Sequence, residues 1–153
     1  MQHRKITEEM LIKCLSHFFF MRCSRCGKCC EKTEMLLSKA DMQLLRELRY
    51  SLIDYTICDN KGFIRLKNMK GYCVFYDFKT RKCKIYESKP LGCRIYPIMF
   101  SEEEGVIVDD LCPVKNTVSK RELKHKGGIL VELLKRIDCE AEKRDKVLFY
   151  YKG

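Results

Sequence analysis

The chain has 153 residues and a mass of 18.2 kDa, and 46% of its residues are hydrophobic, which is enough to bury the core of one domain. Its net charge of +10 suits an anionic partner or a well-solvated surface, and its longest apolar run is far shorter than the roughly 18 residues of a membrane span. Its 11 cysteines are an odd number, which excludes a framework in which every cysteine pairs within the chain.

The start of the chain lacks the features of a secretory signal. Glu8 and Glu9 are acidic, and Lys13 and His17 interrupt the apolar residues that follow. We therefore expect a cytoplasmic protein, in a compartment that keeps cysteines reduced. A dense group of cysteines in such a protein is more often a metal site or a reactive site than a set of disulfides.

Two helices are predicted in the first third of the chain. Thr7, followed by two acidic residues, is typical of a helix N-cap, so a helix is expected from about Thr7 through Phe20, with its three consecutive phenylalanines in the core. Ser38 and Asp41 form a capping-box pattern ahead of apolar residues at helical spacing. This pattern predicts a second helix that continues to about Tyr50.

The composition changes twice in the remaining chain. From Gly62 onward, short runs such as GFIRLK, YCVFYDF, KCKIY and CRIYPIMF alternate with turn-forming residues, which predicts short strands. From about Ser119 the helical spacing returns in ILVELLKRI, where Gly127 and Gly128 are expected to break or to start a helix.

The predicted fold class is a small α+β, loop-rich, metal-stabilised domain, with helices at both ends flanking a cysteine-rich middle that has short strands. We expect a single domain over residues 1–153. Its metal-binding cysteine-cluster core is predicted at about 23–113, and a C-terminal helical extension at about 117–150.

Eight of the cysteines form a pattern that is typical of metal ligands. The stretch CSRCGKCC repeats the C-x2-C step twice, and a tight turn at Gly27 lets both sulfurs of such a step face one ion while backbone N–H groups bond to them. Three further cysteines, Cys73, Cys83 and Cys93, follow with nine residues between each, and a fourth, Cys112, is followed by Pro113. The predicted metal and cofactor ligands are Cys23, Cys26, Cys29, Cys30, Cys73, Cys83, Cys93 and Cys112.

The adjacent pair Cys29 and Cys30 indicates two metal centres. In an extended backbone neighbouring side chains point to opposite sides, so two thiols in this position do not easily bind one small ion. We predict one centre at Cys23, Cys26, Cys29 and Cys112, and a second at Cys30, Cys73, Cys83 and Cys93. A single centre with additional redox-active thiols is the alternative.

The other three cysteines, Cys14, Cys58 and Cys139, stand apart in segments of apolar or regular character. A free cysteine behaves as a small buried hydrophobe, so we expect these three in the core and not in the metal site. His3, His17 and His125 do not have ligand spacing from any cysteine, and ordinary surface or capping roles are expected for them.

The motifs CSRCGKCC, LLSKADMQLL, GYCVFYDFKTRKCKIYESKPLGCRIYP and LCP resemble, in this order, those of the CxxCxxCC cysteine-cluster family, the YkgJ-type proteins described as zinc- or iron-chelating. A related cysteine domain occurs in flagellin lysine methylase. The resemblance covers Cys23 to Pro113, about 60% of the chain, and implies a zinc or iron site. The family usually has arginine before the proline ahead of its seventh cysteine. Lys89 stands there in this chain, which removes a bidentate guanidinium group.

Thiolate ligands suit both zinc and iron–sulfur clusters. The C-x2-C-x2-C run resembles that of bacterial-type ferredoxins, whereas structural zinc sites generally use two close pairs of ligands. We therefore expect one or two iron–sulfur clusters of the 4Fe-4S type, with zinc as the alternative.

Two groups of residues are expected around this site. Cations close to the ligands in sequence compensate thiolate charge or simply solvate the surface; they are Arg94, Lys28 and Lys84. Aromatic residues form a dry shell around the metal or belong to the general core; they are Tyr72, Phe75, Tyr86, Tyr96 and Phe100.

The predicted function is that of a cytosolic metalloprotein that serves electron transfer, cluster handling or a partner enzyme. The alternative is a structural zinc-binding module for protein or nucleic-acid interaction. We expect a protein partner, whose identity the sequence does not reveal, and no membrane association. Nucleic acid has weaker support, because Lys and Arg are scattered along the chain without a block of five or six. Independent catalysis is not expected, since no nucleotide-binding loop or catalytic triad is recognisable.

Overall fold

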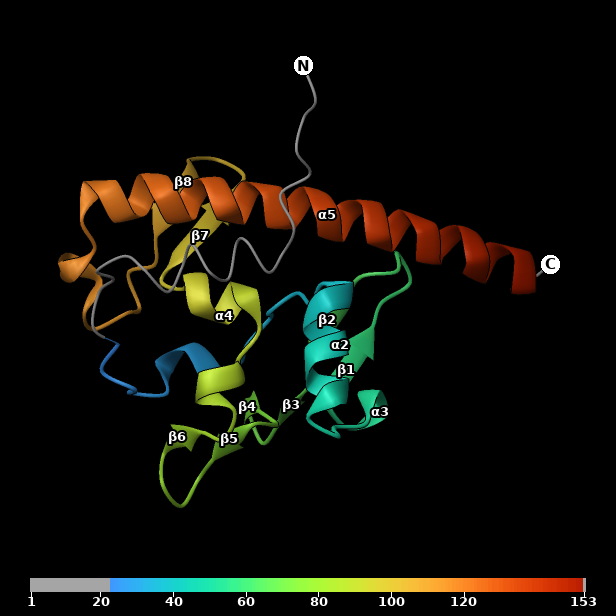
Figure 1. Ribbon diagram of the computed structural model, residues 1–153, viewed down its shortest axis with the longest axis horizontal. Helices are drawn as coiled ribbons and strands as arrows, with labels where there is room; N and C mark the ends of the chain where they lie inside the picture. Colours follow the sequence, from blue (N-terminus) through green and yellow to red (C-terminus); the bar gives the residue numbers. More distant parts are fainter. Residues whose placement is uncertain (1–22, 153) are drawn as a thin grey trace.

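A computed structural model describes residues 23–152 of the chain, and the expected helix from Thr7 to Phe20, together with Cys14, lies outside the described residues. The described part is a small α+β fold with short strands in its middle and a long helix at its C-terminal end, as predicted. This helix, α5, lies along one side of the molecule, and the shorter elements gather on the other side (Figure 1).

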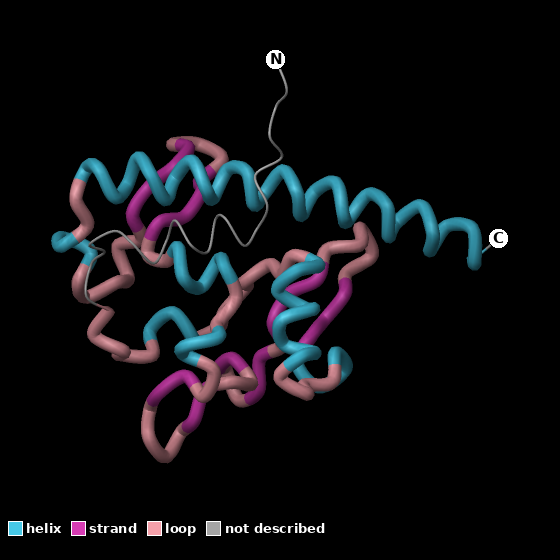
Figure 2. The backbone as a smooth tube through the Cα atoms, in the orientation of Figure 1, coloured by secondary structure: helices cyan, strands magenta, loops and turns pink. Residues whose placement is uncertain are grey.

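Regular elements are short before α5. The helices and 3₁₀ turns are η1 (Lys28–Cys30), α2 (Lys39–Glu47), α3 (Leu52–Tyr55), η2 (Tyr86–Ser88), α4 (Leu91–Ile95), η3 (Lys115–Thr117) and α5 (Lys120–Lys152). Four antiparallel hairpins pair β1 (Thr56–Cys58) with β2 (Ile64–Leu66), β3 (Asn68–Met69) with β4 (Tyr72–Cys73), β5 (Tyr76–Asp77) with β6 (Lys82–Cys83), and β7 (Ile98–Ser101) with β8 (Gly105–Val108). Loops join these elements (Figure 2). None of the described helices combines the length and the apolar character needed to cross a bilayer.

The capping box predicted for α2 is confirmed. Asp41 donates its backbone N–H to the Ser38 hydroxyl at 3.2 Å, and its carboxylate accepts the Ser38 N–H at 2.9 Å. The helix ends at Glu47, slightly before the predicted end at Tyr50. Asp41 is buried and also accepts the backbone N–H of Leu91 at 2.8 Å, so the start of α2 is joined to the start of α4.

The apolar interior consists of two clusters. The first lies between α2, α3 and the short hairpins, and its buried members are Cys30, Leu37, Met42, Leu45, Tyr55, Leu66, Cys73, Phe75 and Ile85. The second joins α4 and β7 to α5, and its buried members are Leu91, Ile95, Ile98, Ile129, Leu130, Leu133 and Ile137. Two candidate metal ligands, Cys30 and Cys73, are therefore buried in the first cluster, and the second cluster contains none.

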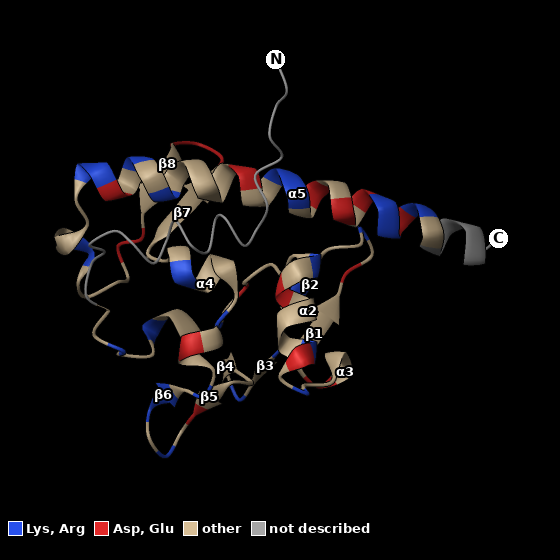
Figure 3. Cartoon of the chain, viewed as in Figure 1, with Lys and Arg blue, Asp and Glu red and all other residues tan. Residues whose placement is uncertain are grey.

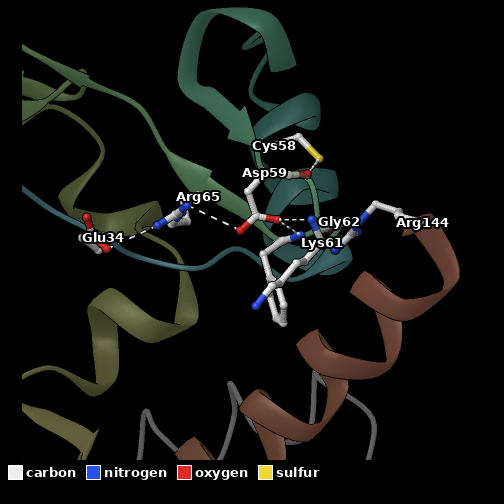
Figure 4. A network of polar contacts seen from close by, with 8 residues as sticks. Glu34, Cys58, Asp59, Lys61, Gly62, Arg65 and Arg144 are labelled. Atoms are coloured by element: carbon white, nitrogen blue, oxygen red, sulfur yellow. Dashed lines mark hydrogen bonds and ion pairs between the residues drawn. The ribbon is translucent and has the colours of Figure 1, made fainter. Parts of the chain in front are cut away.

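Helix α5 is also fastened to the first half of the fold by polar contacts. The Glu140 carboxylate accepts the first backbone N–H of α2, from Lys39, at 2.7 Å. Arg144 donates through Nε to the Gly62 carbonyl at 2.8 Å, in the loop that Asp59 organises (Figure 4). Gly62 has φ +83°, and a Cβ there would collide with the Ala141 carbonyl, so this contact requires glycine.

The prediction that Gly127 and Gly128 break or start a helix is wrong, because α5 runs through both residues. The reason is tertiary packing. A Cβ on Gly127 would lie 2.7 Å from the Val106 side chain on β8, so glycine allows the helix to approach the β7–β8 hairpin closely. Burial of the apolar face of α5 exceeds the roughly 1 kcal/mol cost of each helical glycine.

The two glycines are expected to respond oppositely to alanine. Gly128→Ala meets nothing within 4 Å and should stabilise the fold by about 0.5–1 kcal/mol through helix propensity. Gly127→Ala should destabilise it by about 1–3 kcal/mol, because the methyl group overpacks against Val106. Urea unfolding of the two variants measures both values. Equal shifts of the same sign would contradict this packing argument.

Candidate metal centre

All eight predicted ligands line one cavity of about 250 Å3. The CSRCGKCC loop, β4, β6, α4 and the loop before η3 each contribute cysteines to its wall, and these segments are far apart in sequence (Figure 1). The cavity wall contains no histidine or carboxylate among the described residues. The cysteines described are all free thiols, so the donor atoms available here are sulfur only.

The turn geometry that was expected at Gly27 is present. Gly27 has φ +77° and precedes η1, and a Cβ there would lie 2.7 Å from the Tyr76 ring. The loop therefore folds tightly over Tyr76 of β5, which is possible only because glycine carries no side chain. This turn brings the three C-x2-C cysteines and Cys30 to the same cavity.

The Arg25 backbone N–H donates to the Cys23 sulfur, two residues before it. The backbone N–H groups of Phe75, Ile85 and Val114 have the same spacing and lower the pKa of Cys73, Cys83 and Cys112. The Arg25 nitrogen lies 3.3 Å from the Cys23 sulfur. Such bonds stabilise negative charge on sulfur and are typical of metal–thiolate sites. The same local arrangement thus recurs in four separate segments of the cavity wall.

The premise of two oppositely directed thiols at Cys29 and Cys30 is wrong. Both residues lie in the 3₁₀ turn η1, not in an extended segment, and their side chains hydrogen-bond to each other. The Cys30 thiol is also hydrogen-bonded to Cys83. The backbone therefore does not by itself separate the cysteines into two centres.

Hydrogen bonding and burial set the proton affinity of these thiols in opposite directions. The bond from Cys30 is the main cause that lowers the pKa of Cys29 to about 7 and that of Cys83 to about 6, and Lys89 contributes to both shifts. Burial raises the pKa of Cys73 to about 11 and that of Cys93 well above its ordinary value. Cys29 and Cys83 are thus the positions of this group that ionise most readily near neutral pH.

Cations and one tyrosine surround the cavity mouth. The Arg25 guanidinium lies 3.9 Å from the centroid of the Tyr86 ring, and the Lys89 ammonium lies 4.2 Å from it. Arg94 donates to the carbonyl of Lys89 at 2.8 Å and to that of Glu87 at 3.2 Å. Lys89 therefore places a point charge, and Arg25 a guanidinium, over the Tyr86 ring. The Arg94 guanidinium instead binds the two backbone carbonyls.

Sequence reasoning missed two cations of this site, Arg25 of the CSRCGKCC loop and Lys126 of α5. Lys126 lines the cavity although it is only 3% exposed, and its ammonium lies 2.7 Å from the Glu122 carboxylate, which is also buried. A buried ammonium requires such a partner. The Glu122 and Lys126 spacing of four residues is visible in the sequence, but only the fold shows that this pair points inward.

Of the other residues predicted around the site, some line the cavity and others do not. Arg94 and Lys28 line the cavity, whereas Lys84 does not. Phe75, Tyr86 and Tyr96 belong to its wall, whereas Tyr72 stacks on Tyr76 outside it and Phe100 is 46% exposed on β7.

The expectation of a core position is wrong for Cys58 and Cys139, which are exposed, and both are outside the cavity wall, as predicted. His125 is also absent from that wall, and His3 and His17 lie outside the described residues.

Within residues 23–152, no three His, Cys, Asp or Glu side chains are placed to hold a single metal ion, and the eight sulfurs instead surround the cavity. Residues 22–113 match the CxxCxxCC family, whose description is "Putative zinc- or iron-chelating domain". The chain belongs to this family. Membership in the CxxCxxCC family supports a metal-binding role for the cysteine cluster.

A relative in Methanocaldococcus jannaschii, named only as an uncharacterized protein, is 32% identical over 108 residues. The match covers 69% of this chain and 57% of the relative, so it spans a little more than half of that protein. No solved structure matches the chain.

Proposed function

We propose that this member of the CxxCxxCC family is a cytoplasmic metalloprotein that binds iron–sulfur clusters and serves electron transfer, cluster handling or a partner enzyme. The observation that carries the proposal is a cavity of about 250 Å3 whose candidate metal-binding side chains, among residues 23–152, are eight cysteines. An all-sulfur donor set is the one that iron–sulfur clusters use, although zinc accepts it as well. The proposed ligands are Cys23, Cys26, Cys29, Cys30, Cys73, Cys83, Cys93 and Cys112.

The number of sulfurs favours more than one bare ion. A tetrahedral zinc site uses four ligands. Eight cysteines line this cavity, so a single zinc ion would leave half of them without a role.

The chain's own residues suit such a group in three ways. Backbone N–H groups stabilise the negative charge of the thiolates; they belong to Arg25, Phe75, Ile85 and Val114. The Lys89 ammonium and the Arg94 guanidinium, both in the cavity wall, reduce the net negative charge of the site. Its aromatic wall limits access of water and oxidants; it consists of Phe75, Tyr86 and Tyr96. A bound cluster would supply a one-electron redox couple at this position.

The identity of the metal is tested by anaerobic purification followed by iron, sulfide and zinc analysis. The protein is expected to be brown, with a broad absorption band at about 400 nm that bleaches on reduction, and its Mössbauer spectrum reports the cluster type. Colourless protein that contains one or two zinc ions would replace the proposal by the structural zinc module.

The division of the ligands is tested with cysteine variants. Two centres remain the proposed arrangement: Cys112 interacts with Cys26 and Cys23 of its own group and Cys30 with Cys83 of its own, although Cys30 also contacts Cys29 of the other group. Cys30→Ser and Cys112→Ser are each expected to lower metal content by about half. Complete loss of metal in either variant would instead indicate one shared centre.

Two exposed cysteines provide matched controls for this experiment. Cys58→Ser and Cys139→Ser remove a thiol outside the cavity, so metal content should be unchanged. Metal loss in these controls equal to that of Cys112→Ser would contradict the assignment of the ligands.

A further inference from the structure

Most of the net positive charge lies in two segments that are separate in the sequence, and the fold brings these segments together. Residues 23–33 and 67–84 together carry nine Lys or Arg and two carboxylates, so they contribute +7 to the net charge of +10. Lys32 donates its backbone N–H to the Gly71 carbonyl at 2.7 Å, and Glu31 pairs with Tyr72, which places the first segment against the β3–β4 hairpin. The charge is thus concentrated in space, although the sequence has no block of cations.

Six of these cations have exposed side chains, and we call this set the basic face. In the part of the chain that the structure describes, their side chains have no hydrogen bond or ion pair with a neighbour. The basic face consists of Lys28, Lys32, Lys70, Lys79, Arg81 and Lys82. Several blue segments mark the β5–β6 hairpin, with one red segment at β5, and this hairpin lies across the molecule from α5 (Figure 3). Like charges at this density repel one another unless an anion binds between them.

The acidic residue within the hairpin does not neutralise this face. Asp77 accepts the backbone N–H of Lys79 and the Thr80 hydroxyl, each at 2.9 Å. Its carboxylate therefore holds the turn that presents Lys79, Arg81 and Lys82.

Aromatic rings lie on the same two hairpins as four of these cations. Tyr72 and Tyr76 are stacked with their centroids 4.5 Å apart, and Phe78 meets both rings edge-on at 5.3 and 5.2 Å. Phe78 is 51% exposed at the hairpin turn, and the neighbouring Met69 is 56% exposed. An exposed ring on a hairpin that is surrounded by cations is suited to stack on a nucleobase whose phosphates bind the cations.

We propose that the basic face, with Phe78 at its centre, binds single-stranded nucleic acid. Lysine is depleted from protein–protein interfaces, yet five of the six cations are lysine, which favours a phosphate backbone over an acidic protein. The major groove of a duplex admits an α-helix or a two-stranded ribbon, but the β3–β4 and β5–β6 hairpins present no helix, and their strands of two residues make only a short ribbon. Unpaired bases, in contrast, are free to stack on Phe78.

This proposal does not depend on which metal the cavity holds, and it is tested on the full chain as purified anaerobically. Fluorescence anisotropy measures binding of labelled oligouridylate and oligothymidylate of about 20 nucleotides, a duplex of equal length, and polyglutamate. We expect salt-sensitive binding of the single strands and weaker binding of the duplex. Comparison of the first two probes distinguishes RNA from DNA as the ligand.

Two triple variants with the same change in charge locate the site. K79E/R81E/K82E should weaken binding and reduce the slope of log K against log salt by about 2, since each phosphate contact contributes about 0.7 for single strands. K124E/K143E/K146E changes exposed lysines on α5 and should leave that slope unchanged. Phe78→Ala should weaken binding about tenfold through the lost stacking.

Circular dichroism and metal content of every variant establish that the fold is intact. Equal loss of binding in both triple variants would overturn the proposal, since attraction would then depend on total charge only. Duplex binding as tight as single-strand binding would overturn it as well. Binding of polyglutamate without binding of the oligonucleotides would assign the face to an acidic protein instead.

Discussion

Removal of the metal is expected to abolish protection of the cysteine-bearing segments from hydrogen exchange while α5 remains protected. The β3–β4 and β5–β6 hairpins have only two residues in each strand, and two-stranded hairpins of this kind are marginal in water. Metal bonds between Cys23 and Cys112 would close a long stretch of chain and thereby stabilise these hairpins. Helix α5, in contrast, is held by a separate apolar cluster.

Hydrogen exchange with mass spectrometry measures this difference before and after treatment with a chelator under anaerobic, reducing conditions. Exchange in residues 23–33 and 68–85 should accelerate at least tenfold, which corresponds to about 1.4 kcal/mol of local stability. Exchange in residues 127–141 should change much less. Restoring the metal provides the control. An equal loss of protection in both regions would show one cooperative unit and contradict the division into two clusters.

Features that depend on residues close together in the sequence were predicted correctly. The Ser38 and Asp41 pattern predicted the start of α2 because a capping box needs only residues three apart. The spacing of CSRCGKCC predicted the tight turn at Gly27. The eight candidate ligands were selected by the same reasoning, and the fold brings all of them to one cavity.

Features that depend on tertiary packing were not predictable in this way. Gly127 continues a helix because Val106 packs against it. Cys29 and Cys30 have helical backbone because the loop folds over Tyr76. Apolar neighbours in the sequence did not indicate which face Cys58 and Cys139 occupy, since a residue next to buried side chains often points to solvent.

Substitution of Asp41 is expected to be among the most damaging single changes outside the cysteines. This buried carboxylate accepts three hydrogen bonds, from the Ser38 N–H, the Ser38 hydroxyl and the Leu91 N–H, at 2.9, 2.7 and 2.8 Å. Asp41→Ala leaves these buried donors without their acceptor, and each unmet group costs about 1–3 kcal/mol. We expect a loss of about 3–5 kcal/mol in urea unfolding, whereas Glu47→Ala on the exposed side of α2 should change stability by less than about 0.5 kcal/mol.

Asp41 also affects the metal site. Its bond to Leu91 fixes the start of α4, and α4 places Cys93 in the cavity wall. Ser38→Ala removes the helix cap but leaves the bond from Leu91, so it should cost about 1 kcal/mol without loss of metal. Asp41→Asn retains only one acceptor oxygen and should lower both stability and metal content. Metal analysis of the two variants at a temperature where both are folded separates the roles. Equal metal content in both would show that Asp41 stabilises α2 without positioning Cys93.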